Sequence, residues 1–143
     1  MATTLFRGPV LQGKFNEAGL TGYNLNNKSA DYTVLIGDSG TTITSSTGTS
    51  ATDASSDGPT FTLPAVAANE GSTFTFVNTA SDAGNEIIVT GAGGAEYIAY
   101  KGVVNQLTLT NTLATSKVGD YVTVTGNRAG TEWTITAIQG VWA

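Results

Sequence analysis

The sequence predicts an all-β protein, an antiparallel β-sandwich of jelly-roll-like type that carries an extended N-terminal arm. Three observations lead to this prediction. From Tyr32 onward apolar and polar residues alternate with period two, which is the pattern of half-buried strands. Turn-forming residues separate the alternating stretches at short intervals. No long stretch repeats its apolar positions with the helical period of 3.6 residues. Short strands with frequent turns are typical of sandwiches and barrels.

Each expected strand follows from its own alternation of residues. Phenylalanines alternate with threonines near residues 60–66 and 72–79, and Trp133, Ile135 and Ala137 alternate with threonines near the C-terminus. Threonine is β-branched and suits the solvent face of a strand. Turn segments such as Asp38-Ser39-Gly40 separate the strands. The expected strands cover residues 32–37, 41–46, 60–66, 72–79, 86–91, 97–102, 105–112, 120–127 and 132–138, with a short one at 140–142.

The chain is expected to divide into an extended arm at residues 1–31 and a sandwich domain at residues 32–143. Apolar residues of the arm follow no period, and Gly8, Pro9 and Gly13 oppose a helix. The arm therefore either packs along its own sandwich or docks on another subunit. For the second alternative, the candidate partner-binding residues are Leu5, Phe6, Val10, Leu11 and Phe15.

Two further features of the sandwich domain carry expectations. Residues 45–58 contain only Ser, Thr, Gly, Ala and Asp, so we expect an exposed mobile loop there. Trp133 lies on the apolar phase of its strand and is expected in the core. Trp142 either caps the sandwich or forms a subunit contact, where tryptophan is favoured.

The composition of this 143-residue chain argues against several classes of function. It contains no His and no Cys, which excludes a Ser–His–Asp triad, a cysteine nucleophile and the usual zinc sites. Six basic residues, spread along a chain of net charge −5, do not form the basic patch that nucleic acid requires. No segment has the apolar core of a signal peptide or the length of a membrane span. We therefore expect no enzymatic activity, no cofactor, no metal site, and neither nucleic acid nor a membrane as a partner.

A set of motifs in constant order extends over residues 32–142. They are Tyr32-Thr33-Val34, Asp38-Ser39-Gly40-x-Thr42-Ile43, Phe61-Thr62-Leu63-Pro64, Gly71-x-x-Phe74-x-Phe76-Val77, Gly119-Asp120-Tyr121-Val122-x-Val124, Gly130-Thr131-x-Trp133-x-Ile135 and Gly140-x-Trp142. This order resembles that of the small head decoration (cement) proteins of tailed bacteriophages. It is less closely similar to β-rich modules of tail fibres.

The resemblance implies a structural virion protein, made in the host cytoplasm and located on the outer surface of the capsid. There it would bind the major capsid protein and stabilise the shell, as a homotrimer at local three-fold axes. The arm at 1–31 is not part of the shared pattern. The alternative is a host-binding or glycan-binding β-module of a tail fibre or appendage.

Overall fold

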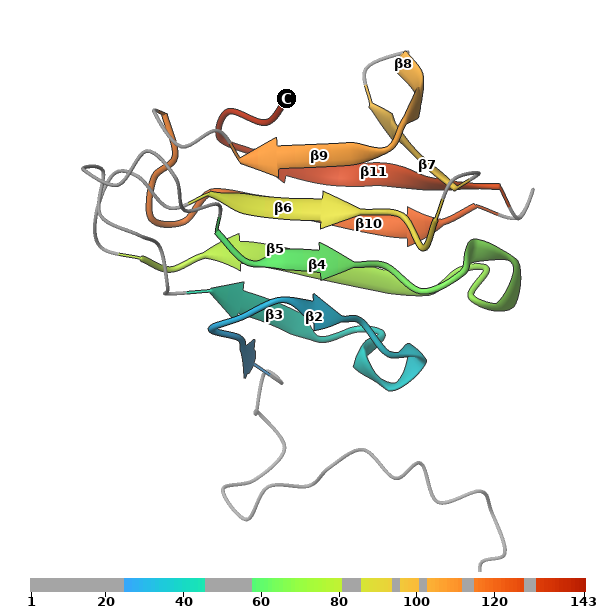
Figure 1. The fold of residues 1–143 in the computed structure, drawn as a ribbon, viewed down its shortest axis with the longest axis horizontal. Helices are drawn as coiled ribbons and strands as arrows, with labels where there is room; N and C mark the ends of the chain where they lie inside the picture. The colour runs from blue at the N-terminus through green and yellow to red at the C-terminus, as the bar shows by residue number, and fades with distance from the viewer. Residues whose placement is uncertain are drawn as a thin grey trace, which may run out of the picture.

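The structure is a computed structural model that describes residues 25–45, 58–80, 86–93, 96–100, 103–111, 115–127 and 131–143. These residues form strands and two short 3-10 helices (Figure 1), which confirms the predicted all-β class. The elements are β1 (Leu25–Asn27), β2 (Tyr32–Thr33), η1 (Ile36–Asp38), β3 (Thr42–Ser45), β4 (Thr60–Thr62), η2 (Val66–Ala68), β5 (Thr73–Asn78), β6 (Ile87–Thr90), β7 (Tyr97–Tyr100), β8 (Val103–Gln106), β9 (Thr108–Asn111), β10 (Tyr121–Gly126) and β11 (Glu132–Gln139).

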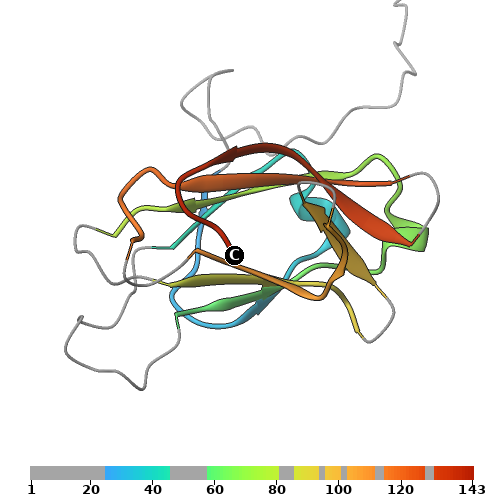
Figure 2. The same ribbon diagram turned by 90° about the horizontal axis from the view of Figure 1, so that it is seen from above.

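The strands form two sheets that lie face to face as two layers (Figure 2). One sheet has seven strands in the order β1-β3-β5-β10-β11-β7-β8, and the other has four in the order β2-β4-β6-β9. Alternating residues place one side of each strand in the space between the layers. In β5, for example, Phe74 and Phe76 are fully buried while Thr73 and Thr75 are half-buried on the outer side.

The core between the layers is built from aromatic and aliphatic side chains of both sheets. Phe61 of β4 stacks on Phe76 of β5 with ring centroids 5.2 Å apart, so this pair joins the two layers. Trp133 of β11 packs against Phe74, with centroids 5.4 Å apart. The prediction that Trp133 lies in the core is confirmed, since none of its surface is exposed.

The prediction of a purely antiparallel arrangement is wrong, because several neighbouring strands run parallel. The first six strands alternate between the sheets, so that β1, β3 and β5 are parallel neighbours in one layer. In the other layer β2, β4 and β6 are parallel neighbours in the same way. This part of the chain therefore passes from one sheet to the other at each successive strand. Both sheets are therefore mixed, and the jelly-roll topology stays a prediction.

Crossing between the layers explains how parallel neighbours form without helices. Parallel strands need a long connection, and in α/β proteins a helix supplies it. Here the connection from one strand to its parallel neighbour contains a strand of the opposite sheet. Antiparallel pairs follow later in the chain, between β7 and β8, between β9 and β6, and between β10 and β5.

Several predicted strand boundaries are also wrong. The expected strand at 32–37 ends at Thr33 and is followed by η1, because the Asp38 carboxylate accepts hydrogen bonds from the Leu35 backbone N–H and the Tyr32 hydroxyl. The expected strand at 105–112 is divided at Leu107 between β8 and β9, which belong to different sheets. Strand β1 was not predicted and lies within the segment assigned to the arm.

A buried polar network holds the C-terminal residues against the body. The Asp120 carboxylate accepts hydrogen bonds from the Lys117 backbone N–H at 2.9 Å and from Asn111 Nδ2 at 3.1 Å. Asn111 Nδ2 also donates to the Val141 carbonyl at 3.1 Å, and Asn78 Nδ2 donates to Asn111 Oδ1 at 3.2 Å. Buried polar groups are stable when they are hydrogen-bonded in this way. The network ties β5, β9 and the end of the chain together.

We expect the variant Gly140→Ala to be less stable than the variant Gly40→Ala. Both glycines have positive φ, 94° and 77°, so both substitutions carry the same kind of backbone strain, about 1–2 kcal/mol. A Cβ at Gly40 meets nothing within 4 Å, whereas one at Gly140 collides with the Asp120 carboxylate. The collision adds roughly 1–3 kcal/mol. Urea unfolding of both variants measures the difference in their unfolding free energies. Equal losses of stability would mean that the Asp120 carboxylate does not lie next to Gly140.

Candidate functional site

The predicted partner-binding residues lie outside the described part of the chain. Leu5, Phe6, Val10, Leu11 and Phe15 all precede Leu25, where the described residues begin. Of the predicted mobile loop at 45–58, residues 46–57 also lie outside the described residues.

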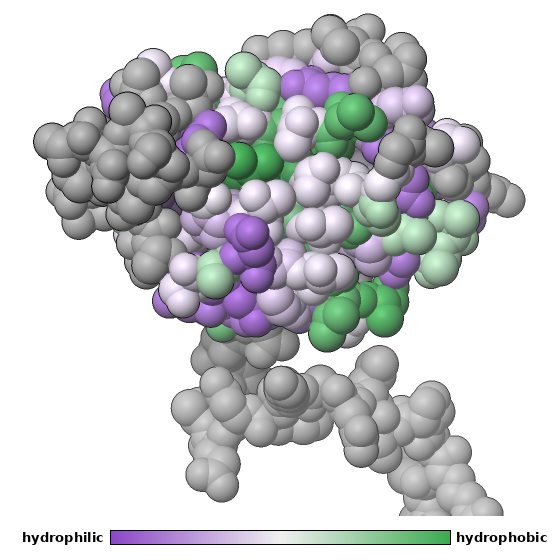
Figure 3. Space-filling view, viewed as in Figure 1, coloured by the Kyte–Doolittle hydropathy of each residue, from purple (hydrophilic) through white to green (hydrophobic). Residues whose placement is uncertain are grey.

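Three apolar side chains are exposed near the edge of the body where the two sheets end in β1 and β2. Leu25 is 67% exposed, Leu35 is 58% exposed and Ile36 is 57% exposed. We call these three residues the β1–η1 surface. Figure 3 shows a hydrophobic group at the lower right, where Figure 1 places η1. At this edge the two sheets end in β1 and β2, strands of only three and two residues. Exposed apolar side chains that gather on a surface can mark a place where another chain binds.

Asp38 connects the parts of the β1–η1 surface. Its Oδ1 atom accepts a hydrogen bond from Asn26 Nδ2 at 3.3 Å, next to Leu25. Its Oδ2 atom accepts from the Leu35 backbone N–H at 2.9 Å and from the Tyr32 hydroxyl at 2.8 Å. One carboxylate therefore positions β1 and η1 together. The apolar run Val34-Leu35-Ile36 is the signal for this surface in the sequence, but the alternation pattern predicts a strand at 32–37 there instead.

Tyr32 adds a titratable group beneath this surface. Burial raises the pKa of the Tyr32 hydroxyl above its ordinary value, and the hydrogen bond and negative charge of Asp38 raise it further. Lys28 Nζ lies 3.6 Å from the centroid of the Tyr32 ring, which is a cation–π contact. The neutral phenol is thus the form that this site stabilises.

We expect the chain to lose stability at alkaline pH through Tyr32. A pKa that is higher in the folded state stabilises the fold below the unfolded value near 10, and this contribution disappears as the pH rises through the folded value. The variant Tyr32→Phe removes that part of the pH dependence, whereas Lys28→Met keeps it. Denaturation midpoints between about pH 8 and 12 measure the effect. A wild-type profile that runs parallel to that of Tyr32→Phe would contradict this assignment.

Trp142 lies in the protein's own core cluster and is 5% exposed. Its indole N–H donates to the Gln139 carbonyl at 2.8 Å, and it forms an isolated bridge with Asn111 of β9. The chain end thus passes from the seven-stranded sheet to the four-stranded one (Figure 2). This burial is what the core alternative predicts, and a subunit contact at Trp142 stays a prediction.

The outer faces of both sheets carry threonines in cross-strand register. On the seven-stranded sheet the hydroxyls of Thr75 and Thr123 lie 3.0 Å apart, and those of Thr73 and Thr125 lie 3.2 Å apart. On the four-stranded sheet one row crosses all strands and consists of Thr33, Thr62, Thr90 and Thr108. These threonine rows are uncharged and weakly polar, which agrees with the solvent-facing role expected for the threonines.

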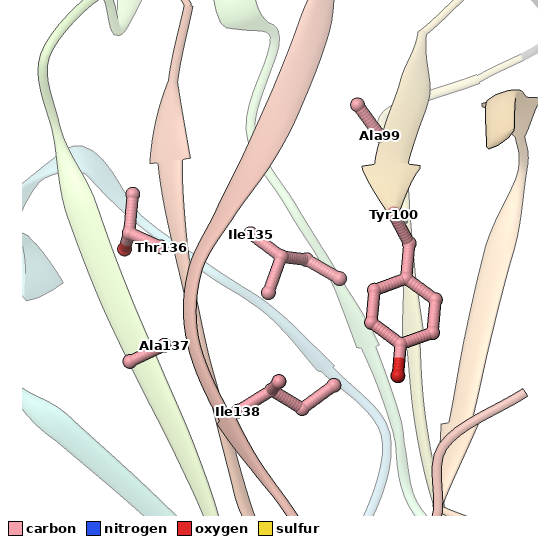
Figure 4. Close-up of a pocket in the computed structure, with 6 residues that line it drawn as sticks. All are labelled: Ala99, Tyr100, Ile135, Thr136, Ala137 and Ile138. Atoms are coloured by element: carbon pink, nitrogen blue, oxygen red, sulfur yellow. The ribbon is translucent and has the colours of Figure 1, made fainter. Parts of the chain in front are cut away.

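A shallow groove of about 330 Å³ lies where β11 and β7 diverge (Figure 4). Strand β7 pairs with β11 only at Glu132–Thr134, so Ile135–Ile138 face no described strand on this side. Ile135, Ile138 and Tyr100 point toward one another in the groove, and all three pack against the core cluster. The remaining lining residues are Ala99, Thr136 and Ala137. The groove could not be predicted from the sequence, because the alternation of apolar and polar residues does not show where two paired strands diverge.

Within the described part of the chain, no group of three or more His, Cys, Asp or Glu is placed to hold a metal ion. No described helix has the length and apolar character needed to cross a membrane. In comparisons with known proteins, no family model matches the chain and no curated protein matches it.

Proposed function

We propose that this chain is a structural virion protein that decorates the outer surface of a phage capsid, binds the major capsid protein and stabilises the shell as a homotrimer. The observation that carries the proposal in the structure is the β1–η1 surface, three apolar side chains that are more than half exposed at the edge formed by β1 and β2. The resemblance of residues 32–142 to decoration proteins suggests that the partner is the major capsid protein. It also suggests that the body is a jelly-roll-like sandwich.

The position of the β1–η1 surface suits attachment by the N-terminal end of the protein. Residues 1–24 join the described body at β1, and a neighbour bound at this edge would contact Leu25, Leu35 and Ile36. Complete burial of a leucine or isoleucine contributes roughly 1.5–3 kcal/mol, and about half of this remains for side chains that are already partly buried. A trimer repeats each such contact three times, and linked contacts strengthen one another through multivalency.

The charge of the chain also supports an outer position. The formal net charge is −5. A protein that binds packaged DNA neutralises phosphates with lysine and arginine, and this chain has only six such residues. An acidic protein on the outside of a shell avoids electrostatic repulsion from the phosphates of the packaged DNA.

Co-sedimentation with capsids that lack the protein tests the proposal. We expect the wild-type chain to sediment with capsids and the double variant Leu35→Asp/Ile36→Asp to bind at least about tenfold more weakly, since two buried apolar contacts are lost. The matched control is Ala67→Asp/Ala68→Asp, which places the same charges on the exposed residues of η2. Wild-type protein that stays in the supernatant, or binds host cells or glycans instead, would favour the tail-fibre alternative.

A further inference from the structure

The groove between β11 and β7 has the geometry of a site that accepts an additional strand. Its lining comes from both faces of the sheet. Ile135 and Ile138 pack against the core on the inner side, while Thr136 and Ala137 are exposed on the outer side. The groove therefore lies in line with the seven-stranded sheet, beside the edge of β11. A strand in this place would point one set of side chains inward and the other outward.

The backbone of β11 is available for such a strand. Ile135, Ala137 and Ile138 pair with β10 on one side, and within the described residues no strand pairs with Ile135–Ile138 on the other. Unpaired backbone groups at a sheet edge bind extended peptides, and pockets along the edge select their side chains. The inner lining, formed by Tyr100, Ile135 and Ile138, selects an apolar residue.

The chain itself contains a segment with matching chemistry. Residues 1–24 include two of the six basic residues and one of the eleven acidic residues, so this segment carries a formal charge of +1. The remainder of the chain carries −6. The segment also contains apolar residues among Gly, Asn and Thr, Leu5, Phe6, Val10, Leu11 and Phe15 among them. The opposite formal charges favour contact between this segment and the body in general. Its apolar residues match the apolar character of the inner lining, which contains no charged residue.

This segment is long enough to reach the groove, and the proposed trimer favours the groove of a second copy over that of its own subunit. The segment joins the body at β1, the outermost strand of the seven-stranded sheet, and β11 lies four strands away in the same sheet. That distance is roughly 19 Å, whereas an extended chain of 24 residues reaches up to about 80 Å. In a closed ring the arm of each subunit can bind the groove of the next subunit, so that every groove is occupied through the same contact.

We propose that the groove between β11 and β7 binds an extended stretch of residues 1–24 from a second copy of this chain, added as a strand beside Ile135–Ile138. The inference extends the proposed homotrimer by naming the surface that holds its subunits together, and rests on the proposed function only for this trimer. It does not depend on which protein the assembled particle then binds.

Disulfide trapping tests the proposal on the full chain, which has no cysteine of its own. One pool carries Ala137→Cys, and a second, larger tagged pool carries a single cysteine at successive positions of the arm. Paired strands bring Cα atoms within the range that a disulfide can bridge. After mixing and mild oxidation we expect heterodimers in one short window of arm positions. Their yield should alternate from one position to the next, because neighbouring residues of a strand face opposite sides.

The control acceptor is Ala67→Cys, on the exposed surface of η2. Heterodimer yields with Ala137→Cys no higher than with this control would overturn the proposal. So would cross-links confined to a single chain when both cysteines are on it, because they would place the arm in its own groove. Only purified protein is needed for the main result. A negative outcome there leaves capsid co-sedimentation unaffected, and the reverse also holds.

Discussion

Deletion of residues 2–20 is expected to abolish capsid binding while leaving a body that melts cooperatively. The deletion ends before Leu25, so it removes none of the described strands and no residue of the core cluster. It does remove the predicted partner-binding residues Leu5, Phe6, Val10, Leu11 and Phe15. Burial of each of these side chains on a neighbour contributes up to roughly 1.5–3 kcal/mol, partly offset by the cost of ordering the arm. Thermal melting and co-sedimentation with capsids measure the two outcomes.

Two results would contradict this expectation, and they point to different places. A truncated protein that fails to fold would place the arm within the core of its own subunit. A truncated protein that binds capsids with undiminished affinity would move the attachment surface to the loops of the body. The variant Arg7→Gln serves as a control for charge, because it removes one positive charge of the arm and leaves the apolar side chains in place.

The variant Phe61→Ala is expected to lose about 3–5 kcal/mol of unfolding free energy, the usual cost of truncating a fully buried phenylalanine. Phe61 is completely buried and stacks on Phe76 across the two sheets, so the cavity opens between the layers. Single domains of this kind have a total stability of about 5–15 kcal/mol, so the loss is a large part of it. Chemical denaturation followed by tryptophan fluorescence measures the change.

Thr62→Ala provides the matched control for Phe61→Ala. Thr62 is the next residue of β4 and is half-buried on the opposite, outer face. Its replacement is expected to cost less than about 1 kcal/mol, within the range of strand propensities. Similar losses for the two variants would show that the assignment of inner and outer faces in β4 is wrong.

The sequence by itself determined which side chains of β5 and of the first half of β11 face the core, whereas the register shift after Ile135 places Ala137 outside and Ile138 inside. Phe74, Phe76 and Trp133 were expected inside and the threonines between them outside, and the structure has them there. The reason is that alternation is a local property: successive residues of a strand point to opposite faces whatever the strand pairs with. For the same reason the all-β class was predictable from residues 32–143 without knowledge of any contact between strands.

Only the tertiary structure decided which strands are neighbours and in which direction they run. The alternation in β3 and β5 is the same whether they pair parallel or antiparallel, and the parallel pairing follows from the path of the chain through the opposite sheet. Likewise, the turn at η1 depends on an Asp38 carboxylate that reaches back to Tyr32 and Leu35 and sideways to Asn26 of β1. The groove beside Ile135–Ile138 exists because β7 leaves β11 after Thr134. These features depend on contacts between residues distant in the chain, which the period of a single strand does not record.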